Sequence, residues 1–131
     1  MDMAYKGCVF SAAGTCGQRC TTLRRLMVVE SHFDAFAARM VSAYKSMKIG
    51  SPLDPNVLVG PLHSKGQVKQ FEDGIAEAKR QGGKVLCGGD VLPGEGNYVT
   101  PCIIEISSDA PIVQTEIFAP ILYMHRIRDF E

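Results

Sequence analysis

The residues best suited to chemistry lie in one short segment, residues 14–22, with the sequence G-T-C-G-Q-R-C-T-T. Cys20 follows a predicted apolar helix and lies in a glycine-containing loop, where a thiol can act as a nucleophile. Glycines let a ligand approach the main chain, and backbone N–H groups nearby can face an oxyanion. Residue type alone favours a plain buried cysteine, because most free cysteines pack as small hydrophobic side chains and helix C-termini do not favour thiolates.

Composition places the chain among globular proteins and excludes several classes. Its 131 residues are 46% hydrophobic and 21% charged, enough for one domain with a core. The 14 basic and 14 acidic residues cancel, so no charge pattern indicates nucleic acid or an anionic membrane. No apolar run approaches the roughly 20 residues that span a bilayer, and no signal-peptide pattern is visible.

Cysteine and histidine usage bears on compartment and metal binding. The five cysteines are odd in number and lack a secretory segment, which favours free thiols in a reducing, intracellular compartment. The three histidines are scattered singly, so paired zinc ligands are missing and we expect no metal site.

Three segments have the periodicity of helices. Residues 2–15 are apolar along much of their length, which is typical of a helix buried in a larger body. Ser31 and Asp34 form a weak capping box, and Ser64 and Gln67 form a better one. The stripe predicted for the last helix consists of Val68, Phe71, Ile75 and Ala78.

Extended segments alternate with these helices. Residues 26–29 predict a buried strand, and residues 85–87, 98–106 and 119–127 predict three more. Pro101 places the third strand at a sheet edge or a bulge. This alternation predicts an α/β fold with at least partly parallel strands, arranged like part of a doubly wound domain.

Several motifs together resemble the aldehyde dehydrogenase superfamily. The segment around Cys20 resembles the family's nucleophile motif G-Q-x-C, and T-E-I-F-A-P at residues 115–120 resembles its second signature, E-x-F-[GA]-P. The loop motifs at residues 50–52 and 60–62 match in order and spacing. The resemblance covers essentially all 131 residues and implies that 1–131 is an incomplete catalytic domain, three-layer, with a largely parallel sheet.

The branch of the superfamily can be narrowed further. Q-R-C-T-T-x-R-R, D-P-N-V-L-x-G-P-L-H and the alanine of F-A-P resemble the aminoadipate-semialdehyde dehydrogenase branch, also called antiquitin. That resemblance implies oxidation of such an aldehyde, in lysine breakdown, with NAD as cofactor and NADP not excluded. It also implies a homo-oligomer, a tetramer in the full-length form, in the cytoplasm or mitochondrion.

The resemblance assigns roles to four residues. Cys20 aligns with the catalytic nucleophile, and Arg19 aligns with an arginine that contacts the substrate carboxylate in this branch. Glu116 aligns with the glutamate that binds the nicotinamide ribose, and Phe118 with an aromatic residue near the nicotinamide. Without the resemblance, a solvated arginine and a core phenylalanine are the simpler interpretations.

Cys16 departs from the small residue expected four positions before the nucleophile. We interpret it as a small-residue substitute, with reversible pairing to Cys20 under oxidation as the alternative. Another candidate function, that of a small thiol redox protein, has little support because no C-x-x-C is present.

In the family, three parts lie upstream of the nucleophile: the cofactor domain, an oxyanion-hole asparagine and the general-base glutamate. This chain has neither a G-x-G-x-x-G nor an E-L-G-G pattern, and the oligomerisation strand is also missing. We therefore expect the isolated chain to be nearly inactive, with exposed apolar surface on the 2–15 helix, marginal stability and self-association. The alternative function is a non-catalytic product that binds full-length subunits.

Overall fold

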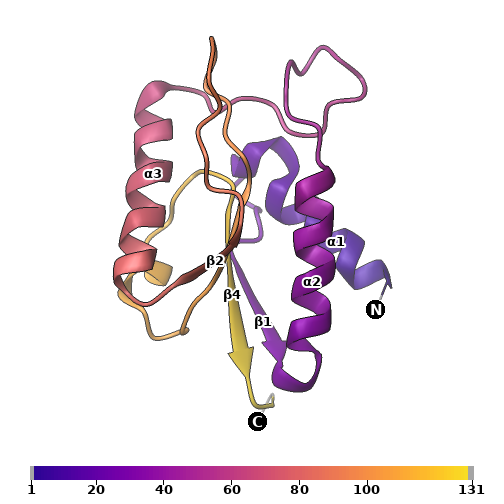
Figure 1. Ribbon diagram of the computed structural model, residues 1–131, viewed down its shortest axis with the longest axis vertical. Helices are drawn as coiled ribbons and strands as arrows, with labels where there is room; N and C mark the ends of the chain where they lie inside the picture. The colour runs from indigo at the N-terminus through magenta and orange to yellow at the C-terminus, as the bar shows by residue number, and fades with distance from the viewer. Residues whose placement is uncertain (1, 130–131) are drawn as a thin grey trace.

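Helices and strands alternate along the computed structural model, which describes residues 2–129 (Figure 1). The element order matches the predicted one, with two short 3-10 helices added. The elements are α1 (Asp2–Ala13), η1 (Gly14–Gly17), β1 (Arg25–Val29), α2 (Glu30–Ser46), α3 (Lys65–Arg80), β2 (Lys84–Cys87), β3 (Cys102–Glu105), η2 (Pro111–Gln114) and β4 (Ile121–Ile127).

The four strands form one sheet in the order β1-β4-β3-β2. β4 pairs in parallel with both β1 and β3, whereas β2 pairs antiparallel with β3. The largely parallel α/β sheet predicted from the sequence is therefore confirmed. Since β1 and β4 are far apart in the chain but adjacent in space, the sheet brings the two family motifs to neighbouring strands.

Helices cover both faces of the sheet, which makes the three layers visible in Figure 1. Because side chains alternate along a strand, β3 and β4 send residues into two separate cores. The core shared with α1 and α2 includes Phe33, Met40, Ile103, Leu122 and Met124. The core shared with α3 includes Phe71, Ile75, Ile104, Ile121 and Tyr123.

The α3 helix begins directly after Ser64, the residue predicted to cap it. The Ser64 hydroxyl accepts a hydrogen bond from the Gln67 N–H at 3.2 Å, which satisfies one of the free donors of the first turn. Phe71, Ile75 and Ala78 are buried along the predicted stripe, and Val68 packs beside them. The stripe holds α3 against the sheet.

The predicted capping box of α2 is wrong. The helix begins at Glu30, directly after β1, and its N-cap residue Val29 makes no side-chain cap. Ser31 is therefore already inside the first turn, where its hydroxyl contacts His32 Nδ1 at 3.1 Å. Asp34 instead forms an ion pair with Arg126 at 2.5 Å, which ties α2 to β4.

Two strand predictions also need correction. The predicted edge position of β3 is wrong: β3 is an inner strand, because Pro101 precedes its first residue, Cys102, and its missing N–H leaves the ladder intact. The alternative, a bulge, is found in the pairing of β3 with β2, where the register shifts between Val85 and Cys87. β1 is only partly buried, since Met27 is 54% exposed. Among residues 2–129, β1 pairs with β4 alone, and α1 and α2 cover only one of its faces.

α1 exposes much of its apolar surface. Met3 is 88% and Phe10 59% exposed, and only Ala12 and Ala13 of this helix are buried. The expected exposed apolar surface is confirmed, whereas burial of the helix is not seen. In the described part of the chain no helix is long and apolar enough to cross a membrane, and no metal-binding cluster of His, Cys, Asp and Glu is found.

Candidate functional site

A tight left-handed turn positions the loop that carries Cys20. Thr15, Cys16 and Gly17 have φ values of 52°, 54° and 66°, directly after α1 ends. Two of these three are not glycine, so the turn holds backbone strain of the kind found at functional sites. We call residues 14–24 the nucleophile loop, after the role predicted for Cys20.

Gly17 brings the two family motifs into direct contact. A Cβ built on Gly17 would lie 2.5 Å from both the carbonyl carbon and the oxygen of Ala119. Such separations are well inside van der Waals contact, and the positive φ also disfavours any side chain. Only glycine therefore lets the nucleophile loop pack on the main chain of the F-A-P motif.

Gln18 joins a third motif to the same loop. Its Nε2 donates to the Pro61 carbonyl at 3.1 Å, and its Oε1 accepts from the His63 N–H at 2.9 Å. The side-chain amide thus satisfies one acceptor and one donor of a loop more than 40 positions away. The G-P-L motif at residues 60–62 is held against the nucleophile loop by this clamp.

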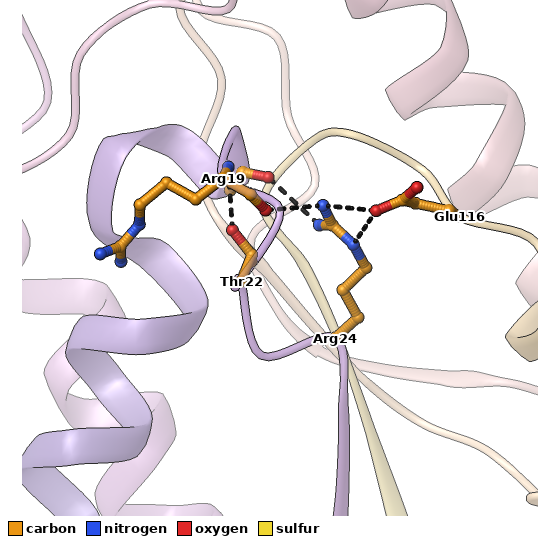
Figure 2. A network of polar contacts seen from close by, with 5 residues as sticks. Arg19, Thr22, Arg24 and Glu116 are labelled. Atoms are coloured by element: carbon orange, nitrogen blue, oxygen red, sulfur yellow. Dashed lines mark hydrogen bonds and ion pairs between the residues drawn. The ribbon is translucent and has the colours of Figure 1, made fainter.

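Arg24 is the most connected side chain of the site, as Figure 2 shows. Its Nε and Nη2 lie 3.2 and 3.1 Å from Glu116 Oε1. Nη1 donates to the Gly17 carbonyl at 3.1 Å, and Nη2 donates to the Arg19 carbonyl at 3.2 Å. The guanidinium also lies 5.0 Å from the centroid of the Phe118 ring, within cation–π range.

A cavity of about 620 Å³ opens beside this network. Cys20 and Glu116 both line it, together with Thr22 and Arg24. Cys20 is exposed, and the Glu116 side chain is 62% exposed, so both can meet a bound molecule. The structure thus brings together the predicted nucleophile and one predicted cofactor contact.

Arg19 and Phe118 do not line that cavity. The Arg19 guanidinium points away from Arg24 and Glu116 in Figure 2. Its Nη2 donates to the Phe10 carbonyl at 2.9 Å, and its Cζ lies 4.8 Å from the Phe10 ring centroid. Phe118 is 37% exposed, and its ring contacts the Arg24 guanidinium, which does line the cavity. The roles of Arg19 and Phe118 stay predictions.

Cys16 and Cys20 have opposite environments. Cys16 is fully buried in the α3-side core, and burial raises the pKa of its thiol to about 12. Cys20 is exposed, and both are free thiols. A buried thiol that stays protonated is a poor partner for thiol–disulfide exchange, so the structure favours the small-residue interpretation of Cys16.

Sequence reasoning overlooked Arg24 and the side-chain role of Gln18. Both belong to the quoted motif Q-R-C-T-T-x-R-R, so paired arginines a few positions after the predicted nucleophile were a usable signal. Nothing local, however, distinguishes Arg24 from Arg25, which is exposed and makes no side-chain hydrogen bond or ion pair with the described residues. Only the fold shows which arginine faces Glu116.

Comparison with known proteins agrees with this geometry. The family model described as the aldehyde dehydrogenase family matches residues 1–131. The chain belongs to the aldehyde dehydrogenase family. The resemblance expected from the sequence motifs is thereby confirmed.

Curated aldehyde dehydrogenase relatives support the branch. "Aldehyde dehydrogenase family 7 member A1" of Brassica napus is 50% identical over 131 residues, which cover 100% of this chain and 26% of that protein. "Alpha-aminoadipic semialdehyde dehydrogenase" of Mus musculus is 47% identical over 132 residues, covering 100% of this chain and 24% of that protein. The chain therefore spans about a quarter of the length of these relatives.

Solved aldehyde dehydrogenase structures share the fold. HpcC from Thermus thermophilus superposes with a TM-score of 0.93 at 32% identity, covering 98% of this chain and 26% of that one. A 1-pyrroline-5-carboxylate dehydrogenase from Thermus with bound NAD gives 0.91 at 31% identity, covering 98% and 25%. The predicted fold, part of an aldehyde dehydrogenase catalytic domain, is confirmed.

Proposed function

We propose that the protein carrying this segment oxidises an aldehyde to a carboxylate, with Cys20 as the nucleophile and NAD or NADP as cofactor. The observation that carries this function is the shared cavity of Cys20 and Glu116, built from motifs of an aldehyde dehydrogenase. An exposed thiol beside an exposed carboxylate provides a nucleophile and a diol-binding group in one place.

Cys20 carries the covalent steps. Its thiolate adds to the aldehyde carbon, forming a C–S bond and an alkoxide, the thiohemiacetal. When the alkoxide reforms the carbonyl, the hydrogen on that carbon leaves with its electron pair, and a thioester on Cys20 remains. Water then cleaves the thioester, which releases the carboxylate and returns the Cys20 thiol. Thioester formation suits a thiol because thiolates are strong nucleophiles near neutral pH.

The cofactor, when bound, supplies the hydride acceptor. The residues present here fit part of its site: the Glu116 carboxylate has two acceptor oxygens, which suits a ribose diol, and Phe118 offers a partly exposed ring. Relatives of known structure include one described as NAD-bound and one described as an NADP-dependent enzyme. We propose NAD, as the branch resemblance implies.

The proposed substrate is a semialdehyde with a distant carboxylate, such as aminoadipate semialdehyde. Curated relatives from mouse, rat and cattle bear the name "Alpha-aminoadipic semialdehyde dehydrogenase", at 45–47% identity. Arg19 binds the carboxylate in this proposal, because a guanidinium can hold a carboxylate bidentately. The carboxylate end of the substrate then lies on the α1 side of the nucleophile loop, where the Arg19 side chain is found.

We further propose an intracellular homo-oligomer, in the cytoplasm or the mitochondrion. All five cysteines are free, as expected of a reducing compartment. The exposed Met3, Phe10 and Met27 offer apolar surface for association. The same surface supports the second candidate, a non-catalytic chain that binds full-length subunits. A longer homologue that co-purifies with the 131-residue chain would favour that candidate.

The direct test is cofactor reduction by the complete native protein and by two cysteine variants. Cys20→Ser should lose at least about 10³-fold in kcat, since a hydroxyl without a partner base is a weak nucleophile. Cys8→Ser, a half-buried cysteine on α1, should keep activity within about twofold. Equal activity of the Cys20→Ser and native proteins would refute this function.

A further inference from the structure

We propose that Arg24 is a positioning residue of the active site: one guanidinium fixes both the peptide bond before Cys20 and the carboxylate of Glu116. The role rests on the proposed aldehyde oxidation, in which Cys20 is the nucleophile and Glu116 contacts the cofactor. Arg24 itself touches neither reacting atom in this account. It acts through the groups that it holds.

The contacts of Arg24 use all three of its nitrogens. Nε and Nη2 bind Glu116 Oε1, while Nη1 and Nη2 bind the carbonyls of Gly17 and Arg19. The Arg24 side chain is only 15% exposed, and its bonds to the two carbonyls are part-buried, whereas its bond to Glu116 is exposed to water. A guanidinium presents its donors in a rigid fork, and the ammonium of a lysine cannot reproduce this set.

The bond to the Arg19 carbonyl has a consequence for Cys20. In a trans peptide, the carbonyl and the following N–H point in opposite directions. The Arg19 oxygen faces Arg24 and also accepts from the Thr22 N–H at 3.0 Å, so the Cys20 N–H is turned away from both. Arg24 therefore fixes the direction of an N–H that lies beside the nucleophilic sulfur and can face an oxyanion.

The bonds to Glu116 have a consequence for the cofactor. Both of them use Oε1, so Oε2 remains available to a ribose hydroxyl. Because the Glu116 side chain is 62% exposed, the ion pair adds little stability through charge alone. Its main effect is to hold the carboxylate, and the Phe118 ring stacked on the same guanidinium, in one place.

The test compares Arg24→Gln and Arg24→Lys with a matched control in the complete native protein. The control is Arg80→Gln, which removes another arginine–glutamate ion pair, on the exposed side of α3 and outside the nucleophile loop. Two readouts are measured for each protein: the Kd for oxidised NAD, and hydrogen exchange of the Thr22 amide without cofactor. A double-mutant cycle with Glu116→Gln completes the set.

Arg24→Gln should raise the NAD Kd about tenfold. Compared with Arg24→Gln, Arg24→Lys should restore less than half of the lost NAD affinity, measured on a logarithmic scale of Kd. In the Glu116→Gln background, Arg24→Gln should raise the NAD Kd less than about twofold, because Arg24 and Glu116 act as one unit. Thr22 amide exchange should speed up about tenfold in Arg24→Gln. Arg80→Gln should leave both readouts unchanged.

Three results would overturn the role of Arg24: an unchanged NAD Kd, additive effects in the cycle, or unchanged exchange of the Thr22 amide. A native protein that neither binds NAD nor oxidises aldehydes refutes the proposed function instead. In that case hydrogen exchange alone decides whether Arg24 orders the nucleophile loop, and the two failures remain distinct.

Discussion

Arg24 places Nε and Nη2 at 3.2 and 3.1 Å from the same oxygen of Glu116, although 92 positions separate the two residues in sequence. This pair joins the loop that carries Cys20 to the segment that precedes β4. The parallel pairing of β1 with β4 makes the contact feasible, because Arg24 directly precedes β1 and Glu116 lies five residues before β4. The sheet therefore assembles the site from two distant motifs.

Replacing Gly17 with alanine should disrupt the nucleophile loop. The new Cβ would meet the Ala119 carbonyl at 2.5 Å in a left-handed conformation, so the loop must shift. We expect a loss of about 2 kcal/mol or more in unfolding free energy, measured by chemical denaturation. Gly66→Ala is the control: its Cβ meets only Ser64 Oγ at 3.7 Å in the first turn of α3, and stability should hold or rise.

Removing the Gln18 amide should release the loop of residues 60–63. Gln18→Ala deletes the bonds to the Pro61 carbonyl and the His63 N–H, at a cost of about 1–2 kcal/mol. Hydrogen exchange at the His63 amide should accelerate accordingly. Gln70→Ala, at an exposed position of α3, should alter neither quantity. Equal exchange in the two variants would contradict the clamp.

Alkaline pH should destabilise the fold through its buried thiols. Burial raises the pKa of Cys16 and of Cys102 from 9.0 to about 12. Because the pKa of each thiol is higher in the folded state than in the unfolded state, the stability that the protonated thiols contribute is complete below about pH 9. That contribution is lost as pH rises toward 12. Each thiol should steepen the fall in unfolding free energy by about 1.4 kcal/mol per pH unit. Denaturation of Cys16→Ala across this range should show a shallower fall, and an identical slope would contradict the assignment.

Arg19 should discriminate between aldehydes by charge. If it binds the substrate carboxylate, Arg19→Gln in the complete protein should raise KM for a carboxylate-bearing semialdehyde about tenfold or more. KM for an uncharged aliphatic aldehyde of similar length should stay within about twofold. A parallel rise for both aldehydes would show that Arg19 serves only the loop, through its contact with Phe10.

Local chemistry predicted much of the fold. Ser64 caps α3 as its spacing with Gln67 indicated, and the stripe from Val68 to Ala78 packs on the sheet. Prediction was wrong where tertiary context decided the outcome. β1 runs straight into α2 and leaves Ser31 no capping position, and Pro101 falls one residue before β3 and so permits an inner strand.

The site was predictable only in part, for a physical reason. Cys20 and Glu116 were found through motifs, and the fold brings them to one cavity. The bonds that organise the site, from Arg24 to Glu116 and from Gln18 to His63, join residues far apart in sequence. Periodicity and capping rules describe neighbours within one element, so such bonds are invisible until the sheet is assembled.

The most direct test of the central claim is to locate the acyl group during turnover. The complete protein would be mixed with a semialdehyde and oxidised NAD, quenched in acid, digested and mapped by mass spectrometry. A thioester intermediate predicts the acyl mass on the peptide fragment with Cys20, at the sulfur of that residue. Aldehyde oxidation with the acyl group on Cys8 or Cys16 instead of Cys20 would contradict the account.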